Sequence, residues 1–170
     1  MNRMTNLLAT VVALGLFVGG GVVGWNLLTA KSETIAGPTC TERRVEPGEA
    51  LTPNLVQVNV LNASGRGGLA NRVSINLQRY GFLEGGIANS ESEIPVDHVA
   101  IFTDDPEDPM VQLVAQQFQV APQIVAPDVP IDPDGVTVVV GPSYTDLNPA
   151  PPTEIAATRA VDVCVPLAEL

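Results

Sequence analysis

Basic residues are scarce in this sequence, which has 8 Lys and Arg against 19 Asp and Glu and a net charge of −11. Binding to nucleic acid depends on Lys and Arg displacing counterions from phosphate, so the charge argues against a nucleic-acid partner. Histidine and cysteine are scarcer still, with one His and two Cys. One His and two widely separated Cys do not indicate a zinc site, and we expect no metal and no cofactor. The length of 170 residues excludes a large multidomain enzyme.

Charged residues are missing altogether from Leu7–Leu28, a run of 22 residues near the amino terminus. A helix of that length, rising about 1.5 Å per residue, crosses roughly 30 Å of hydrocarbon. Arg3 precedes the run and all 19 acidic residues follow it, so the amino terminus should stay cytoplasmic and the remainder should be exported. We therefore predict a cytoplasmic stub over residues 1–6, a transmembrane helix over 7–28 and a single-pass protein of the cell membrane.

Two further possibilities stay open for this segment: it is removed as a signal peptide, or it anchors the protein and also forms a dimer. A cleavable signal peptide usually has a shorter apolar region, and the nearest cleavage site would need small residues where Leu28 and Ala30 stand. The segment also holds two pairs of glycines four residues apart, a spacing that lets membrane helices approach closely and form a homodimer. These pairs are Gly15 with Gly19 and Gly20 with Gly24.

The two cysteines, Cys40 and Cys164, both lie in the part predicted to be exported, 124 positions apart. In an oxidising compartment an isolated pair is most simply a disulfide. No Cys-x-x-Cys spacing is present, and only Arg43 and Arg44 stand near enough in sequence to stabilise a thiolate. We predict a structural disulfide that joins the two ends of the exported part.

The exported part begins with residues 29–54, a polar stretch broken by three prolines that suits a spacer. Leu55–Leu61 then alternates apolar and polar residues, as a strand does. Leu69–Tyr80 carries apolar residues at helical spacing until Gly81, and the glycine-rich residues 62–68 join the strand to this helix.

More strands and a second helix follow along the chain. The helix should begin at Asp108, whose side chain can cap the free amides, with Pro109 at the first helical position. Val136–Val140 is apolar enough to lie in the middle of a sheet. Other strand candidates are residues 82–88, 98–102, 124–126 and 160–165. The sequence thus predicts an α/β fold, a small sheet with two packed helices, preceded by one N-terminal transmembrane helix.

A family resemblance begins at Val58–Phe82 (VNVLNASGRGGLANRVSINLQRYGF) and returns at Val136–Gly141 (VTVVVG). Over residues 55–147 the chain resembles the LytR C-terminal domain, which is appended to LytR-CpsA-Psr cell-wall polymer transferases and also occurs in membrane-anchored proteins without the transferase. The resemblance implies a role in the cell envelope without transferase activity. The Pro-rich residues 148–170 would then fold back through the disulfide.

The loop that joins the first strand to its helix is a candidate ligand site, made of Asn62, Ser64, Gly65, Arg66, Gly67 and Gly68. Free amides and the helix dipole at such a place can hold an anion. The glycine spacing fits no nucleotide-binding motif. The alternative is structural: the glycines permit a tight turn, and Asn62 bonds the loop backbone.

Arginine is concentrated beside this loop. Arg66, Arg72 and Arg79 lie within 14 residues, and the last two, seven apart, share one helical face. A local cationic strip on an acidic protein can select an anionic polymer, because contacts inside the Debye length of about 8 Å escape most of the distant repulsion. A solvated helix face is the simpler explanation.

Catalytic residues are not indicated. His98 is the only histidine, the acidic residues 104–108 lack the EF-hand spacing, and Ser64 and Ser143 do not stand in a Gly-x-Ser-x-Gly elbow. We therefore expect a non-catalytic protein that binds cell-wall glycan or a cell envelope assembly protein. Two alternatives stay open: a small enzyme that acts on cell-wall polymers through Asp97 or His98, and a membrane scaffold that dimerises through its glycine-rich helix.

The anchor prediction is tested by the amino terminus of the mature protein. Because the apolar segment should stay in the bilayer, mature protein from intact cells should retain residues 7–28 and sediment with membranes after a high-salt wash. Mass spectrometry of the intact chain makes the measurement. A mature chain that starts after residue 28 contradicts the anchor.

Overall fold

The computed structural model describes residue 20, residues 40–133 and residues 135–166, with side chains over 41–133 and 135–163. The chain divides into two compact units, Met1–Gly37 and Pro38–Leu170. Among the described residues, no helix is both long and apolar enough to cross a bilayer. The predicted membrane segment 7–28 and its glycine pairs lie, apart from Gly20, outside the described residues, so the anchor and the homodimer stay predictions.

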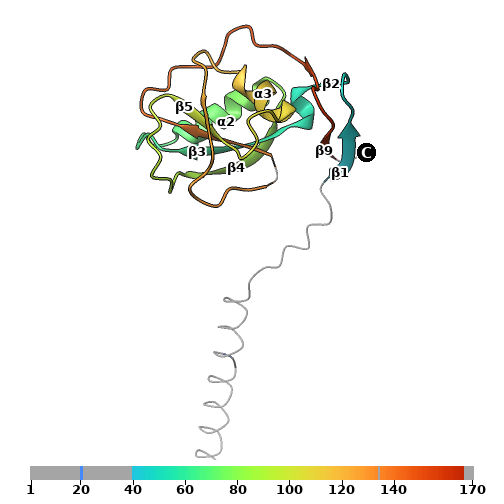
Figure 1. The fold of residues 1–170 in the computed structure, drawn as a ribbon. Coiled ribbons are helices and arrows are strands. Elements are labelled where there is room, and N and C mark those ends of the chain that lie inside the picture. Colours follow the sequence, from blue (N-terminus) through green and yellow to red (C-terminus); the bar gives the residue numbers. More distant parts are fainter. Residues whose placement is uncertain (1–19, 21–39, 134, 167–170) are drawn as a thin grey trace, which may run out of the picture. The chain divides into compact units, whose positions relative to one another are not determined.

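A five-stranded mixed sheet forms the centre of the second unit (Figure 1). In spatial order its strands are β4 (Leu83–Asn89), β3 (Gln57–Asn62), β7 (Val136–Val140), β5 (Val99–Phe102) and β6 (Gln123–Val125). Strand β3 runs parallel to both neighbours, whereas β5 runs antiparallel to β7 and parallel to β6. The position of β7 in the middle, with all five residues buried, is as predicted from its apolar sequence.

Two helices complete the predicted α/β architecture. Helix α2 (Leu69–Arg79) joins β3 to β4, and helix α3 (Pro109–Ala115) joins β5 to β6. The predicted cap of α3 is confirmed, because the Asp108 carboxylate accepts a hydrogen bond of 2.7 Å from the Met110 amide. Both helices pack on the same face of the sheet, where the alternate residues of β3 and β7 point. This core includes Val58, Val60, Val136, Val138, Leu69, Val73, Leu77, Leu113 and Val114.

The opposite face of the sheet has no helix over it among the described residues. A smaller apolar cluster gathers there around Phe102 and Val139, packed against residues of the loops at 94–96 and 129–131. Two polar residues, Asn59 and Thr137, stand opposite each other on this face and are 3% and 2% exposed. The Asn59 side chain accepts a hydrogen bond of 2.6 Å from the Gly86 amide, where the register between β3 and β4 shifts. Burial of an amide at this position depends on such a partner.

The prediction that residues 29–54 form a spacer is wrong for residues 40–54. This stretch contains β1 (Cys40–Val45), β2 (Ala50–Leu51) and the start of the 3₁₀ helix η1 (Pro53–Leu55). Strand β1 pairs with β9 (Val161–Pro166), and β2 pairs with β8 (Ile155–Ala156), both antiparallel. Val45 and Leu51 are fully buried and join the main core. The partners stand more than 100 residues away in sequence, so local pattern alone does not reveal the pairing.

The ladder between β1 and β9 brings the two cysteine positions onto neighbouring strands. Cys40 stands opposite Pro166, and Cys164 stands opposite Glu42, so the cysteines are two register positions apart. Their side chains lie outside the described residues, and the disulfide therefore stays a prediction.

The disulfide is tested by the state of the thiols and by the stability of serine variants. In full-length protein purified without reductant, neither cysteine should react with an alkylating agent. The double variant Cys40→Ser/Cys164→Ser should lose up to about 5 kcal/mol of unfolding free energy, because its unfolded chain is no longer cross-linked. Each single variant should lose as much as the double variant, since one serine already removes the bond. Free thiols in protein from intact cells contradict the prediction.

Candidate functional site

The candidate site lies where the parallel strands β3 and β7 end. The loop 62–68 begins at the last residue of β3, and the loop 141–144 follows β7. The Ala63 amide donates a hydrogen bond of 2.9 Å to the Val140 carbonyl, so the two loops start side by side. In open α/β sheets, ligands bind outside the carboxyl ends of parallel strands. The fold therefore places the predicted loop at a position that suits ligand binding.

Hydrogen bonds within the loop hold its shape. The Asn62 Oδ1 accepts from the Ser64 amide at 3.0 Å and from the Ser64 hydroxyl at 2.6 Å. The Asn62 Nδ2 donates to the Arg66 carbonyl at 2.9 Å, and the Ser64 hydroxyl accepts from the Arg66 amide at 3.0 Å. Gly65 and Gly68 have φ of +66° and +75°, which favour glycine. The structural explanation thus accounts for Asn62 and Ser64, whose polar atoms are engaged inside the loop.

The first turn of α2 has no side-chain cap. Its N-cap is Gly68, which carries no side-chain oxygen, and the turn contains no acidic residue. Amides at the start of a helix that have no such partner, together with the helix dipole, attract anions. Gly67 and Gly68 are exposed, so this end of the helix is open to solvent.

The described arginines fall into two groups by their partners. Arg43 pairs with Glu49, Arg44 with Glu46 and Asp162, and Arg159 with Asp105 and Asp108. The other three, Arg66, Arg72 and Arg79, form no ion pair within the part of the chain that the structure describes. Arg66 donates only a long hydrogen bond of 3.5 Å to the Pro142 carbonyl, and Arg79 donates to the Asn76 side chain at 3.3 Å. We call Arg66, Arg72 and Arg79 the arginine strip.

The structure also brings Ser143 beside the sequence neighbours Asp97 and His98, a contact that the sequence does not predict. The Ser143 hydroxyl donates to Asp97 Oδ1 at 2.6 Å, and His98 Nε2 lies 3.4 Å from Asp97 Oδ2. His98 Nδ1 lies 2.8 Å from the Ser143 carbonyl. In a serine hydrolase the histidine stands between the serine and the acid, but here the aspartate stands between them. This arrangement fastens the 141–144 loop to the start of β5 and does not activate Ser143.

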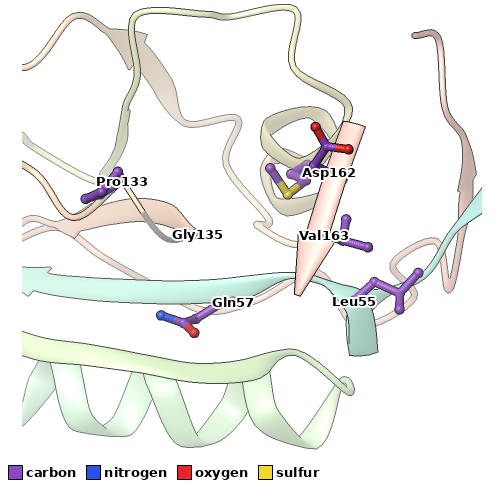
Figure 2. Close-up of a pocket in the computed structure, with 7 residues that line it drawn as sticks. Leu55, Gln57, Pro133, Gly135, Asp162 and Val163 are labelled. Carbon is purple, nitrogen blue, oxygen red and sulfur yellow. The ribbon is translucent and has the colours of Figure 1, made fainter. Parts of the chain in front are cut away.

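A small cavity lies on the other side of the domain, where β9 meets the start of β3 (Figure 2). Leu55, Gln57, Gly135 and Val163 line it, and its volume is about 110 Å³. Ligand pockets are typically about 300 to 1,000 Å³, so this cavity is too small for a ligand. Asp162 at its rim forms the ion pair with Arg44 at 3.3 Å.

Two acidic residues just before α3, Asp105 and Asp108, have defined partners. The Arg159 guanidinium hydrogen-bonds Asp105 and holds the pKa of that carboxyl below its usual range, and Asp108 caps the helix. Within the described residues, no group of three His, Cys, Asp or Glu side chains is arranged to hold a metal ion.

Tyr144, in the loop after β7, is buried with 8% exposure. Its hydroxyl has no hydrogen-bond partner among the described residues. Burial, together with the nearby Asp146 and Tyr80, raises the pKa of Tyr144 to about 12. The Tyr144 ring thus packs in the core, and its phenol stays protonated at physiological pH.

Comparisons with known proteins give one family and one solved structure. Residues 55–144, more than half of the 170, match the family model described as LytR cell envelope-related transcriptional attenuator. The soluble domain of a conserved hypothetical secreted protein from Mycobacterium marinum is 26% identical, with 61% of this chain and 68% of that chain covered and a TM-score of 0.43. No curated protein sequence matches the chain.

Replacing Tyr144 with Phe should stabilise the domain. The substitution removes a buried hydroxyl without a partner, which costs about 1 to 3 kcal/mol when it is left unsatisfied, and keeps the ring in the core. Because the folded-state pKa is raised above the usual value of 10.0, the wild type should also lose stability as the pH rises from 10.0 toward about 12, and the variant should lose less. Denaturant unfolding at pH 7 and pH 11 measures both effects. Equal or lower stability of Tyr144→Phe at both pH values contradicts this account.

Proposed function

Because the chain belongs to the LytR cell envelope-related transcriptional attenuator family, we propose that it is a membrane-anchored, non-catalytic protein that supports the integrity of the cell envelope. The description of the family names the cell envelope and an attenuator, and it names no catalytic activity. The proposed activity is binding: the predicted anchor fixes the domain at the outer face of the membrane, and the domain engages cell-wall glycan or an envelope assembly enzyme.

One observation carries the binding proposal, namely the arginine strip without ion pairs. The chain has 19 acidic residues, and the other three described arginines all find carboxylate partners. Surface ion pairs contribute only about 0 to 1 kcal/mol each, so stability alone does not require such pairing. In so acidic a protein, three arginines on one loop and its helix that form no ion pair among the described residues supply positive charge that favours anionic groups of a partner.

The uncapped start of α2 adds hydrogen-bond donors near the arginine strip. Arg66 stands two residues before Gly68, and Arg72 lies one turn into the helix. Helix amides and two arginines therefore supply hydrogen-bond donors near the start of α2, which suits phosphate or carboxylate groups on a wall polymer. Asn62 and Ser64 support this proposal indirectly, because they fix the loop that carries Arg66.

The proposed role in envelope integrity rests on a resemblance in layout. One predicted anchor, one domain of this family and a cysteine pair that brackets it resemble the actinobacterial envelope integrity protein Cei. We propose the same kind of role here, and the partner is either wall glycan or an assembly protein of the envelope.

The binding proposal is tested by charge reversal in the full-length protein. Changing Arg66, Arg72 and Arg79 to Glu should reduce retention on an isolated cell-wall fraction about tenfold or more at low ionic strength, because attraction becomes repulsion. Sedimentation with the wall fraction measures retention, and thermal unfolding checks the fold.

The matched control changes Arg43, Arg44 and Arg159 to Glu, which alters the net charge by the same amount on another part of the surface. This control should keep most of its retention. Equal losses in both variants would indicate an effect of net charge alone, and unchanged retention of the first variant would remove the arginine strip from the proposed function.

A further inference from the structure

A polar hollow of about 370 Å³ lies at the carboxyl end of α2. It is lined by Asn76, Arg79 and Tyr80 of the helix end and by Asp146 and Leu147 of the segment after β7. Its volume falls within the range of about 300 to 1,000 Å³ that is typical of ligand pockets. Only Arg79 of these residues belongs to the arginine strip.

Hydrogen bonds fix both sides of the hollow. The Tyr80 hydroxyl donates to the Asn148 carbonyl at 3.1 Å, which ties the helix end to the segment 146–148. The Asn148 amide donates to the Gln117 carbonyl at 2.8 Å, and Leu147 forms a bridge with Phe118. The hollow is therefore preformed, and a ligand would not have to order its walls.

The polar groups of the hollow are of opposite kinds and do not neutralise each other. Arg79 offers donors and Asp146 offers acceptors, yet no ion pair joins them in the described structure. The Asp146 Oδ1 accepts from the Leu147 amide at 2.8 Å, and no hydrogen bond to Oδ2 is present among the described residues. A simple anion would meet Arg79 but would be repelled by Asp146, whereas hydroxyl groups can accept from the first and donate to the second.

The Tyr80 ring adds an apolar wall to this polar set. The residue is 36% exposed although its hydroxyl already donates a hydrogen bond, so what it offers to a ligand is mainly its apolar ring. A sugar has a face of C–H groups and a rim of hydroxyl groups, which match the ring and the mixed donors and acceptors.

We infer that this hollow binds one neutral sugar unit of a glycan chain. The inference rests on the proposed function and deepens it, because it names the ligand class at the far end of the arginine strip. Anionic groups of the same chain would lie toward Arg72 and Arg66. The hollow would thus bind the sugar unit, and Arg66 and Arg72 would bind the anionic groups.

The test uses full-length protein in a detergent without a sugar headgroup. Maltotriose, arabinotriose and N,N′,N″-triacetylchitotriose are titrated separately, and inorganic phosphate serves as the anionic probe. At least one trisaccharide should bind saturably by calorimetry. Tyr80→Ala should weaken this binding about tenfold, and Asp146→Asn should weaken it about fivefold. Tyr80→Phe, which keeps the ring, should lose less than Tyr80→Ala. The control Val120→Ala removes a side chain that is 41% exposed and outside the hollow, and it should bind as the wild type does.

Three results would overturn the inference. One is no saturable binding of any of the three trisaccharides, and another is binding that Tyr80→Ala leaves unchanged while the variant stays folded. The third is inorganic phosphate that competes with the trisaccharide for the wild-type protein, since that would mark the hollow as an anion site. Retention on the wall fraction separates the two proposals. If the arginine variant loses retention but no sugar binds, the proposed function stands and only the sugar inference fails. If a sugar binds but the protein is not retained on the wall fraction, only the proposed function is contradicted.

Discussion

The parallel pairing of β3 with β7 is the constraint on which the rest of the structure depends. Five residue pairs join the two strands, and all five residues of β7 are buried. A strand covered on both faces cannot slip in register without exposing apolar side chains, so the ends of both strands are fixed. The loops 62–68 and 141–144 therefore leave the sheet together. Their closeness, and the position of Arg66 near Pro142, follow from this one pairing.

Charge is distributed unevenly over this frame. Acidic residues dominate the chain, and the arginines of β1 and of the segment before β9 are engaged with them. The arginine strip stands apart on the loop and helix that follow β3. Arg79, in the last turn of α2, also interacts favourably with the negative end of the helix dipole. Helix α2 thus carries Arg72 and Arg79, which form no ion pair among the described residues, and a polar hollow lies at its carboxyl end.

Much of the central fold is predictable from sequence because its elements are locally periodic. The alternation before Asn62, the helical spacing up to Gly81, the apolar run at Val136–Val140 and the Asp108 cap all appear in the structure at or near the predicted positions. The strand β9 is close to the predicted strand at residues 160–165, but its pairing with β1, and the pairing of the two-residue strands β2 and β8, could not be predicted, because the partners stand more than 100 residues apart in sequence. The loop and the arginines are visible in sequence, but the unequal pairing of the arginines, the cluster of Asp97, His98 and Ser143, and the hollow beside Tyr80 arise only from tertiary contacts.

The central claim is that the surface formed by the loop after β3 and by α2 contacts the cell envelope. Site-specific photocrosslinking in intact cells tests it most directly, with a photoreactive residue in place of the exposed Asn71 on α2 and, as the control, in place of Val120. Mass spectrometry then identifies the adducts. The account predicts adducts with wall glycan or with an envelope assembly protein from position 71 and not from position 120. Equal adducts from both positions, or none from position 71 in protein that is folded and exported, would contradict it.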